Sequence, residues 1–185
     1  MSEPRRVSTS IADTYVLESS ALGDERGWVG ELLRQTWVPG IEFVQWNIVQ
    51  SVAGALRGMH WHERHHDLIA PVAGIVLVGL ADLRRGSPSE RRAELLELDA
   101  SRPAAVVVPP GVAHGLYSSE ATTLLYAVSR YWDPEDELGV AFDDPELGVD
   151  WPCRRDEVIL SERDRMMPPL ARVSPPDYVA AAVLG

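Results

Sequence analysis

Histidines cluster in one short segment of the chain, between the glycines Gly54 and Gly74. Four of the five histidines fall there, at positions 60, 62, 65 and 66. The flanking glycines are typical of turns at the ends of two short strands. Because alternate side chains of a strand share a face, His60 and His62 can reach one small object between them. The spacing therefore predicts a site at this point.

Two further residues complete a set of ligands for a metal ion. Asp67 follows a short reversal of the chain and can bring a carboxylate from the neighbouring strand, and the rigid turn Pro109–Ala113 delivers the fifth histidine, His114. Three imidazoles and one carboxylate (His60, His62, His114 and Asp67) leave coordination positions open on a divalent ion, as in reactive sites. The ligand types suit Fe, Mn, Ni or Zn and do not choose among them. We expect His65 and His66 to be solvated loop residues, and the acidic run 133–137 to be a solvated loop.

Length and composition indicate one soluble globular domain. The chain has 185 residues and is 45% hydrophobic, without a long uncharged apolar run, so no transmembrane segment is expected. The first ten residues contain no apolar stretch typical of a secretory signal. The single cysteine, Cys153, permits no intrachain disulfide and suits a reducing compartment, so the expected location is the cytoplasm.

The charge balance restricts the binding partners. Seventeen basic and twenty-eight acidic residues give a net charge of −11, and every basic residue is an arginine. Such a surface repels nucleic acids and anionic membranes, and neither is an expected partner. A small anionic substrate must be held by a few local arginines.

The pattern of elements is that of an all-β sandwich or barrel. Short apolar runs alternate with turn signals, and no helical period is found before the last part of the chain. The run 41–52 is apolar on both faces, so we expect it to be covered on both sides. Ser161 is expected to cap a short helix, and 175–184 to add a helical turn. The expected strands are 14–17, 28–37, 41–52, 74–83, 93–99, 104–109 and 122–132.

Six motifs are spread along the chain: Asp24–Gly27, Phe43–Asn47, Leu56–His60, Gly86–Ser89, Pro110–Gly115 and Gly148–Pro152. Together they resemble the dTDP-4-dehydrorhamnose 3,5-epimerase family. The resemblance extends over roughly 16–164. It implies an all-β, cupin-type jelly roll with short C-terminal helices, in one domain over 1–185: a flexible lead-in (1–12), the jelly roll (13–152) and a C-terminal helical segment (153–185). It also implies a homodimer formed through the sheets, and a dTDP-linked 4-keto-6-deoxy sugar as the substrate.

The resemblance also implies roles for individual residues. The family removes a proton next to a ketone and returns it to the opposite face, which requires a base and an acid. The base would be His60, oriented by Asp164, and the acid would be Tyr126. The positions matching substrate-binding residues of the family are Arg26, Trp28, Glu31, Gln45, Asn47, Arg57, His114 and Arg163.

Two positions depart from the family. His62 stands where family members carry glutamine, and Asp67 stands where they carry a lysine that stabilises the enolate. Together with Gly54, His60, Gly74, Pro109, Gly111 and His114, they restore the general metal-binding pattern of cupins.

Three functions follow from these observations. The first is epimerisation of nucleotide-linked 4-keto-6-deoxy sugars. The second is a metal-dependent cupin enzyme, such as an oxygenase, isomerase or cyclase acting on a small molecule. The third is a non-catalytic binding cupin. If His60 binds a metal, its lone pair is committed, and Tyr126 or His65 must then act as the base.

Overall fold

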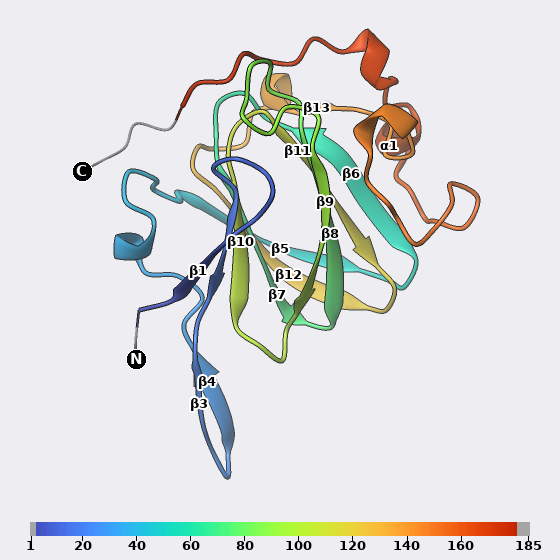
Figure 1. Cartoon of the computed structure of the whole chain (residues 1–185). Coiled ribbons are helices and arrows are strands. Elements are labelled where there is room, and N and C mark those ends of the chain that lie inside the picture. Colours follow the sequence, from blue (N-terminus) through green and yellow to red (C-terminus); the bar gives the residue numbers. More distant parts are fainter. Residues whose placement is uncertain (1–2, 181–185) are drawn as a thin grey trace.

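The chain folds into two facing antiparallel sheets and a separate two-stranded arm (Figure 1). This computed structural model describes residues 3–180. The larger sheet has the strand order β1 (Arg5–Ser8), β2 (Tyr15–Glu18), β10 (Ala104–Val108), β7 (Asp67–Ala73), β12 (Thr122–Val128) and β5 (Gln45–Ser51). The second sheet has the order β13 (Leu138–Gly139), β6 (Ala55–Trp61), β11 (Val112–Ser118), β8 (Ile75–Asp82) and β9 (Ala93–Asp99). The predicted all-β jelly roll is confirmed.

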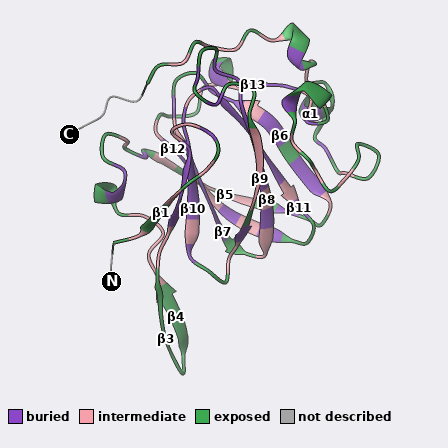
Figure 2. Ribbon diagram, in the orientation of Figure 1, coloured by how far each residue is buried: buried purple, intermediate pink, exposed green. Residues whose placement is uncertain are grey.

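The main core fills the space between the two sheets, where buried residues from both form one apolar cluster (Figure 2). Its members include Ile69 and Leu124 from the larger sheet and Val78 and Leu116 from the second sheet. These side chains alternate with outward-facing residues along their strands, as a sandwich requires.

The histidine segment connects the two sheets. Strand β6 belongs to the second sheet and β7 to the larger one, so residues 62–66 cross from one to the other. His60 pairs with His114 in the β6–β11 ladder, and Asp67 pairs with Val128 in the β7–β12 ladder. The crossing therefore places residues of both sheets at one end of the sandwich.

The beginning of the chain differs from the prediction. The expected flexible lead-in contains strand β1, which pairs with β2. The expected strand 28–37 is shorter: β4 (Gly27–Gly30) pairs with β3 (Ala21–Asp24) to form the arm, which projects from the body (Figure 1). The chain then passes against Pro103, and Leu32 and Leu33 pack against a core cluster instead of continuing the alternation of a strand.

Strand β5 is not covered on both sides. It is the edge strand of its sheet, and the side chains on its outer face are exposed: Trp46 by 48% and Ile48 by 72%. Apolar composition on both faces of this segment therefore does not mean burial on both faces within one chain.

The C-terminal part is mostly irregular. Ser161 caps helix α1 (Glu162–Arg165), as predicted, but the helix is only four residues long. Residues 175–180 are not helical, and the remainder of the predicted turn lies outside the described residues. The expected C-terminal helical segment is thus wrong for most of its length, since Pro168, Pro169, Pro175 and Pro176 interrupt helical geometry. No helix in 3–180 is long and apolar enough to cross a membrane.

Candidate active site

A cavity of about 330 Å³ opens at the end of the sandwich where the histidine segment crosses between the sheets. Strands β5, β6, β11 and β12 form its walls, and the region around α1 closes one side. Nine of the predicted site residues line it: Gln45, Asn47, Arg57, His60, His62, His114, Tyr126, Arg163 and Asp164.

The predicted base and its orienting carboxylate are in contact. His60 Nε2 lies 2.6 Å from Asp164 Oδ1. Asp164 is held in place because its backbone N–H donates to Ser161 Oγ, the cap of α1. Burial raises the pKa of Asp164, but the hydrogen bond from His60 and its positive charge outweigh burial, so the pKa falls below its usual value. A carboxylate that stays ionised fixes Nε2 as the protonated nitrogen and leaves Nδ1 free to accept a proton.

The predicted acid is deep in the same cavity. The Tyr126 hydroxyl donates to Asp67 Oδ1 at 2.9 Å and lies 2.8 Å from His114 Nε2. Burial and the charge of Asp67 raise the pKa of Tyr126 well above its usual value. Tyr126 therefore keeps its proton at neutral pH and can donate it only to a strong base such as an enolate carbon.

His62 and His114 are oriented in the same way. His62 Nδ1 lies 2.8 Å from the carbonyl oxygen of Asp136, and His114 Nδ1 lies 3.3 Å from that of Val112. A carbonyl can only accept, so each Nδ1 carries the proton and each Nε2 presents a lone pair toward Asp67. Burial lowers the pKa of His114 to about 4, so it is neutral at pH 7.

His65 and Asp136 belong to the site, although the sequence predicted both to be solvated. His65 is 4% exposed and Asp136 is 3% exposed. The His65 ring stacks on His62 with centroids 4.1 Å apart, and its Nδ1 lies 3.2 Å from Asp136 Oδ2. Asp136 also accepts the backbone N–H groups of Glu63 and Arg64. The loop prediction failed because this loop folds back over the crossing segment, a contact that no local pattern reveals.

The four predicted metal ligands do not converge as one group. Ligand atoms of His62, Asp67 and His114 lie within 4.8 Å of one another, and a second group of this kind joins His62, His65 and Asp136. His60 belongs to neither group among the described residues, because its Nε2 faces Asp164. The prediction of His60 as a ligand is therefore not supported by this geometry.

Three predicted substrate-binding residues lie away from the cavity of their own chain. Arg26 is at the tip of the arm, paired with Asp24, and Trp28 on the arm is 54% exposed. Glu31 follows the arm and pairs with Arg34. None of the three lines the cavity, because the arm extends outward from the body (Figure 1).

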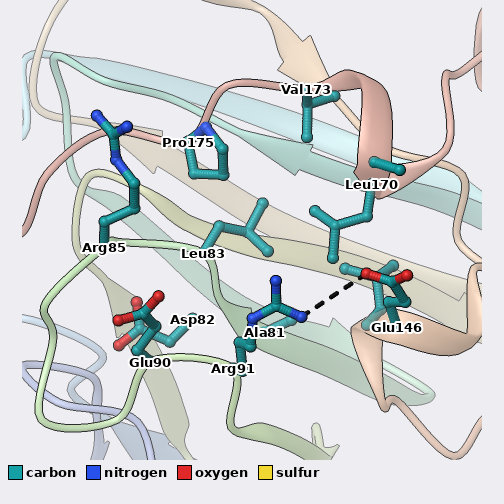
Figure 3. A pocket seen from close by; sticks show the side chains of 12 residues that line it. Ala81, Asp82, Leu83, Arg85, Glu90, Arg91, Glu146, Leu170, Val173 and Pro175 are labelled. Carbon is teal, nitrogen blue, oxygen red and sulfur yellow. Dashed lines mark ion pairs between the residues drawn. The ribbon is translucent and has the colours of Figure 1, made fainter.

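A second cavity lies between the end of β8 and the C-terminal segment (Figure 3). It shares no lining residue with the first cavity. Its charged groups include Arg91 and Glu146, which form an ion pair at 3.7 Å across it. Of these two cavities, the His60 cavity is the one lined by histidine and tyrosine side chains.

Comparison with known proteins identifies the family of the chain. The family model described as dTDP-4-dehydrorhamnose 3,5-epimerase matches residues 8–172. A dTDP-4-dehydrorhamnose 3,5-epimerase of Pseudomonas aeruginosa is 35% identical over 84% of this chain and 90% of that protein. A dTDP-4-dehydro-6-deoxyglucose 3-epimerase of a Streptomyces species is 36% identical over 91% of this chain and 88% of that protein. The crystal structure of an epimerase from Legionella pneumophila in complex with dTDP-4-keto-L-rhamnose superimposes with a TM-score of 0.87 at 29% identity, covering 95% of this chain and 99% of that one.

Proposed function

This chain belongs to the dTDP-4-dehydrorhamnose 3,5-epimerase family, and on that basis we propose how its cavity carries out the reaction. The protein is an isomerase that epimerises dTDP-linked 4-keto-6-deoxy sugars. The observation that carries the proposed mechanism is the 2.6 Å contact between His60 and Asp164 at the cavity wall.

His60 is the base in this mechanism. Asp164 accepts a hydrogen bond from the Nε2–H of His60 and remains ionised. Its negative charge stabilises the imidazolium that forms when Nδ1 takes a proton from the carbon next to the ketone. The electron pair of the broken C–H bond moves onto the ketone oxygen and forms an enolate. The contact with Asp164 also argues against a purely binding cupin, since binding requires no oriented base.

Tyr126 is the acid that completes the inversion. It lies across the cavity from β6, on strand β12 of the facing sheet. Its hydroxyl proton goes to the opposite face of the enolate carbon, and the electron pair returns from the oxygen to re-form the ketone. Two groups on opposite sheets thus serve the two faces of one sugar ring.

The nucleotide part of the substrate is held nearer the opening of the His60 cavity. Arg57 and Arg163 supply positive charge for the diphosphate, and both are kept in place by the chain: Arg57 Nη2 donates to the Gln50 carbonyl at 2.8 Å, and Arg163 Nη1 lies 2.7 Å from Glu137 Oε2. Two guanidinium groups suit a diphosphate because each can donate twice. Gln45, Asn47 and His114 offer polar contacts to the rest of the substrate.

We further propose that two copies of the chain pair through their exposed apolar surfaces. The outer face of β5 exposes Trp46 and Ile48. The arm exposes three apolar side chains by more than half: Leu22, Trp28 and Val29. Burying such a patch against a second copy is favourable. In that dimer the arm of one copy brings Arg26, Trp28 and Glu31 to the cavity of the other. We propose the cytoplasm as the location, because a chain with one cysteine suits a reducing compartment. The net charge of −11 disfavours nucleic-acid or membrane partners.

Solvent exchange tests the proposal. The protein is incubated in D₂O with dTDP-4-keto-6-deoxyglucose, and ¹H NMR follows the C3 and C5 signals. We expect deuterium at an epimerised carbon, and loss of exchange in His60→Asn. Exchange at C3 alone defines a 3-epimerase, and exchange at both carbons a 3,5-epimerase. An unchanged exchange rate in His60→Asn would refute the assignment of the base.

A further inference from the structure

Beside the Tyr126 hydroxyl, three buried side chains direct lone pairs at one another: His62, Asp67 and His114. These residues carry too few protons to join the lone pairs by hydrogen bonds. His62 Nε2 lies 4.0 Å from Asp67 Oδ1, and His114 Nε2 lies 3.9 Å from Asp67 Oδ2. All three residues are less than 5% exposed. The Nδ1–H groups of His62 and His114 donate to backbone carbonyls. Among His62, Asp67, His114 and Tyr126, the hydroxyl proton of Tyr126 is therefore the one left to form a hydrogen bond within the group.

One proton cannot satisfy these acceptors. The hydroxyl lies within hydrogen-bonding distance of both Asp67 Oδ1 and His114 Nε2, and it can donate to only one of them. His65 adds to the imbalance, because its Nε2 is buried, has no hydrogen-bond partner within residues 3–180 and lies 3.4 Å from Asp67 Oδ1. Buried acceptors without a proton are costly. A cation among them would remove the imbalance.

We propose that His62 Nε2, the Asp67 carboxylate and His114 Nε2 bind a divalent transition-metal ion. A histidine that donates Nδ1–H to a carbonyl and presents Nε2 has the orientation typical of a metal ligand. Metal–ligand bonds of about 2.0–2.2 Å hold tetrahedral ligands roughly 3.4 Å apart. The two histidine–carboxylate separations of 3.9 and 4.0 Å are about half an ångström longer than this. One ligand atom from each of the three residues lies within 4.8 Å of the others, so metal binding requires the three side chains to move closer together.

This site leaves the base free. His60 is not a ligand here, so one molecule can hold the metal and still use the His60–Asp164 pair. The role of the ion rests on the proposed function: a cation held by these three residues would supply positive charge for the ketone oxygen and for the enolate oxygen that forms from it. The chain contains no lysine that could supply this charge, and the two cavity arginines already contact Gln50 and Glu137.

The competing explanation is that His65 is doubly protonated and balances Asp67 without any metal. Its contacts with Asp67 and Asp136 raise the pKa of His65, although burial opposes this. A related alternative places the ion at the second group, His62, His65 and Asp136. The experiment must distinguish both alternatives from the proposed site.

Cobalt binding provides that distinction without reference to activity. The full-length untagged protein is stripped with a chelator and titrated with Co²⁺, with visible absorption and thermal unfolding as readouts. We expect one equivalent to bind, to produce ligand-field bands and to raise the unfolding temperature. We expect Asp67→Asn and His62→Gln to weaken binding by roughly 10–100-fold or more. The matched control is His66→Gln, a neighbouring histidine outside both groups, which should bind as the wild type does.

Each other outcome overturns the proposal. Binding that survives in Asp67→Asn but is lost in His65→Asn would place the ion in the second group. Absence of bound Co²⁺ in the wild type would favour the His65–Asp67 pair. Deuterium exchange into the substrate tests the proposed function separately. Exchange without metal binding would refute only the metal site. Metal binding without exchange would refute only the epimerase mechanism.

Discussion

Replacing Asp164 with asparagine isolates the contribution of one charge to catalysis. The side chains have nearly the same shape, so the change keeps the cavity and removes the carboxylate that faces His60 at 2.6 Å. The asparagine amide can also donate to Nε2, which would move the proton of the neutral imidazole to Nδ1, the nitrogen required as the base. Both effects weaken proton abstraction.

The size of the loss follows from the electrostatics of the pair. In the reacting complex His60 carries a positive charge whose centre lies about 4 Å from the centre of the carboxylate charge. The attraction between these two charges is roughly 4 kcal/mol at an effective dielectric constant of about 20. The His60 side chain is 21% exposed, and solvent screening reduces the value to about 2–4 kcal/mol. Each 1.36 kcal/mol corresponds to tenfold in rate, so we expect Asp164→Asn to slow the reaction by roughly 30- to 1,000-fold.

The assay measures the rate of deuterium incorporation by NMR under saturating substrate, with KM determined separately. We expect kcat to fall and KM to change little, because Asp164 orients the base and is not proposed to hold the nucleotide. Ser161→Ala is a useful companion, since it removes the cap that holds Asp164 and should give a smaller loss. A rate within threefold of the wild type for Asp164→Asn would refute the proposed role of the pair.

Three further predictions concern the acid, the fold and the dimer. Tyr126→Phe should retain deuterium exchange at the carbon from which His60 removes a proton but lose inversion, because the base remains and the acid on the opposite face is gone. NMR of the product distinguishes exchange from inversion, and full inversion would exclude Tyr126 as the acid. Asp82 is buried and accepts hydrogen bonds from Arg84, Ser87 and Ser89, so Asp82→Asn should lower the free energy of unfolding by about 3–5 kcal/mol at pH 7. Burial raises the pKa of Asp82, but these hydrogen bonds outweigh burial and lower it below its usual value. The charge of Asp82 therefore stabilises the fold above about pH 4, and the difference in free energy of unfolding between wild type and variant should shrink as pH falls through the lowered pKa. Urea unfolding at several pH values measures this difference, and a difference that does not change with pH would contradict the argument. Ile48→Glu places a charge on the exposed face of β5, and sedimentation should show a shift from dimer to monomer, whereas a wild-type monomer would refute the proposed pairing.

Local patterns in the sequence were sufficient for the class of fold, and motifs along the chain were sufficient for several residues of the candidate site. Alternating apolar residues and turn glycines predicted most strands, because these signals depend on near neighbours along the chain. Gly54 and Gly74, which bracket the histidine segment, indeed adopt the left-handed conformation expected of turns, with φ of 81° and 78°. The motifs around His60, Tyr126 and Asp164 predicted residues that the structure brings to one cavity.

Tertiary structure decided which of the histidines belong together. The spacing of His60 and His62 suggested that both face one ion, yet His60 turns to Asp164, 104 residues later in the chain, and His65 takes a place beside His62. Partners so distant in sequence leave no periodic signal. The arm is a similar case: its residues carry recognisable motifs, but the direction in which it leaves the body depends on packing around Pro103 and Gly30. Residue types and short spacings thus determined which chemical groups the chain can offer. Long-range packing determined which of these groups lie together in one site.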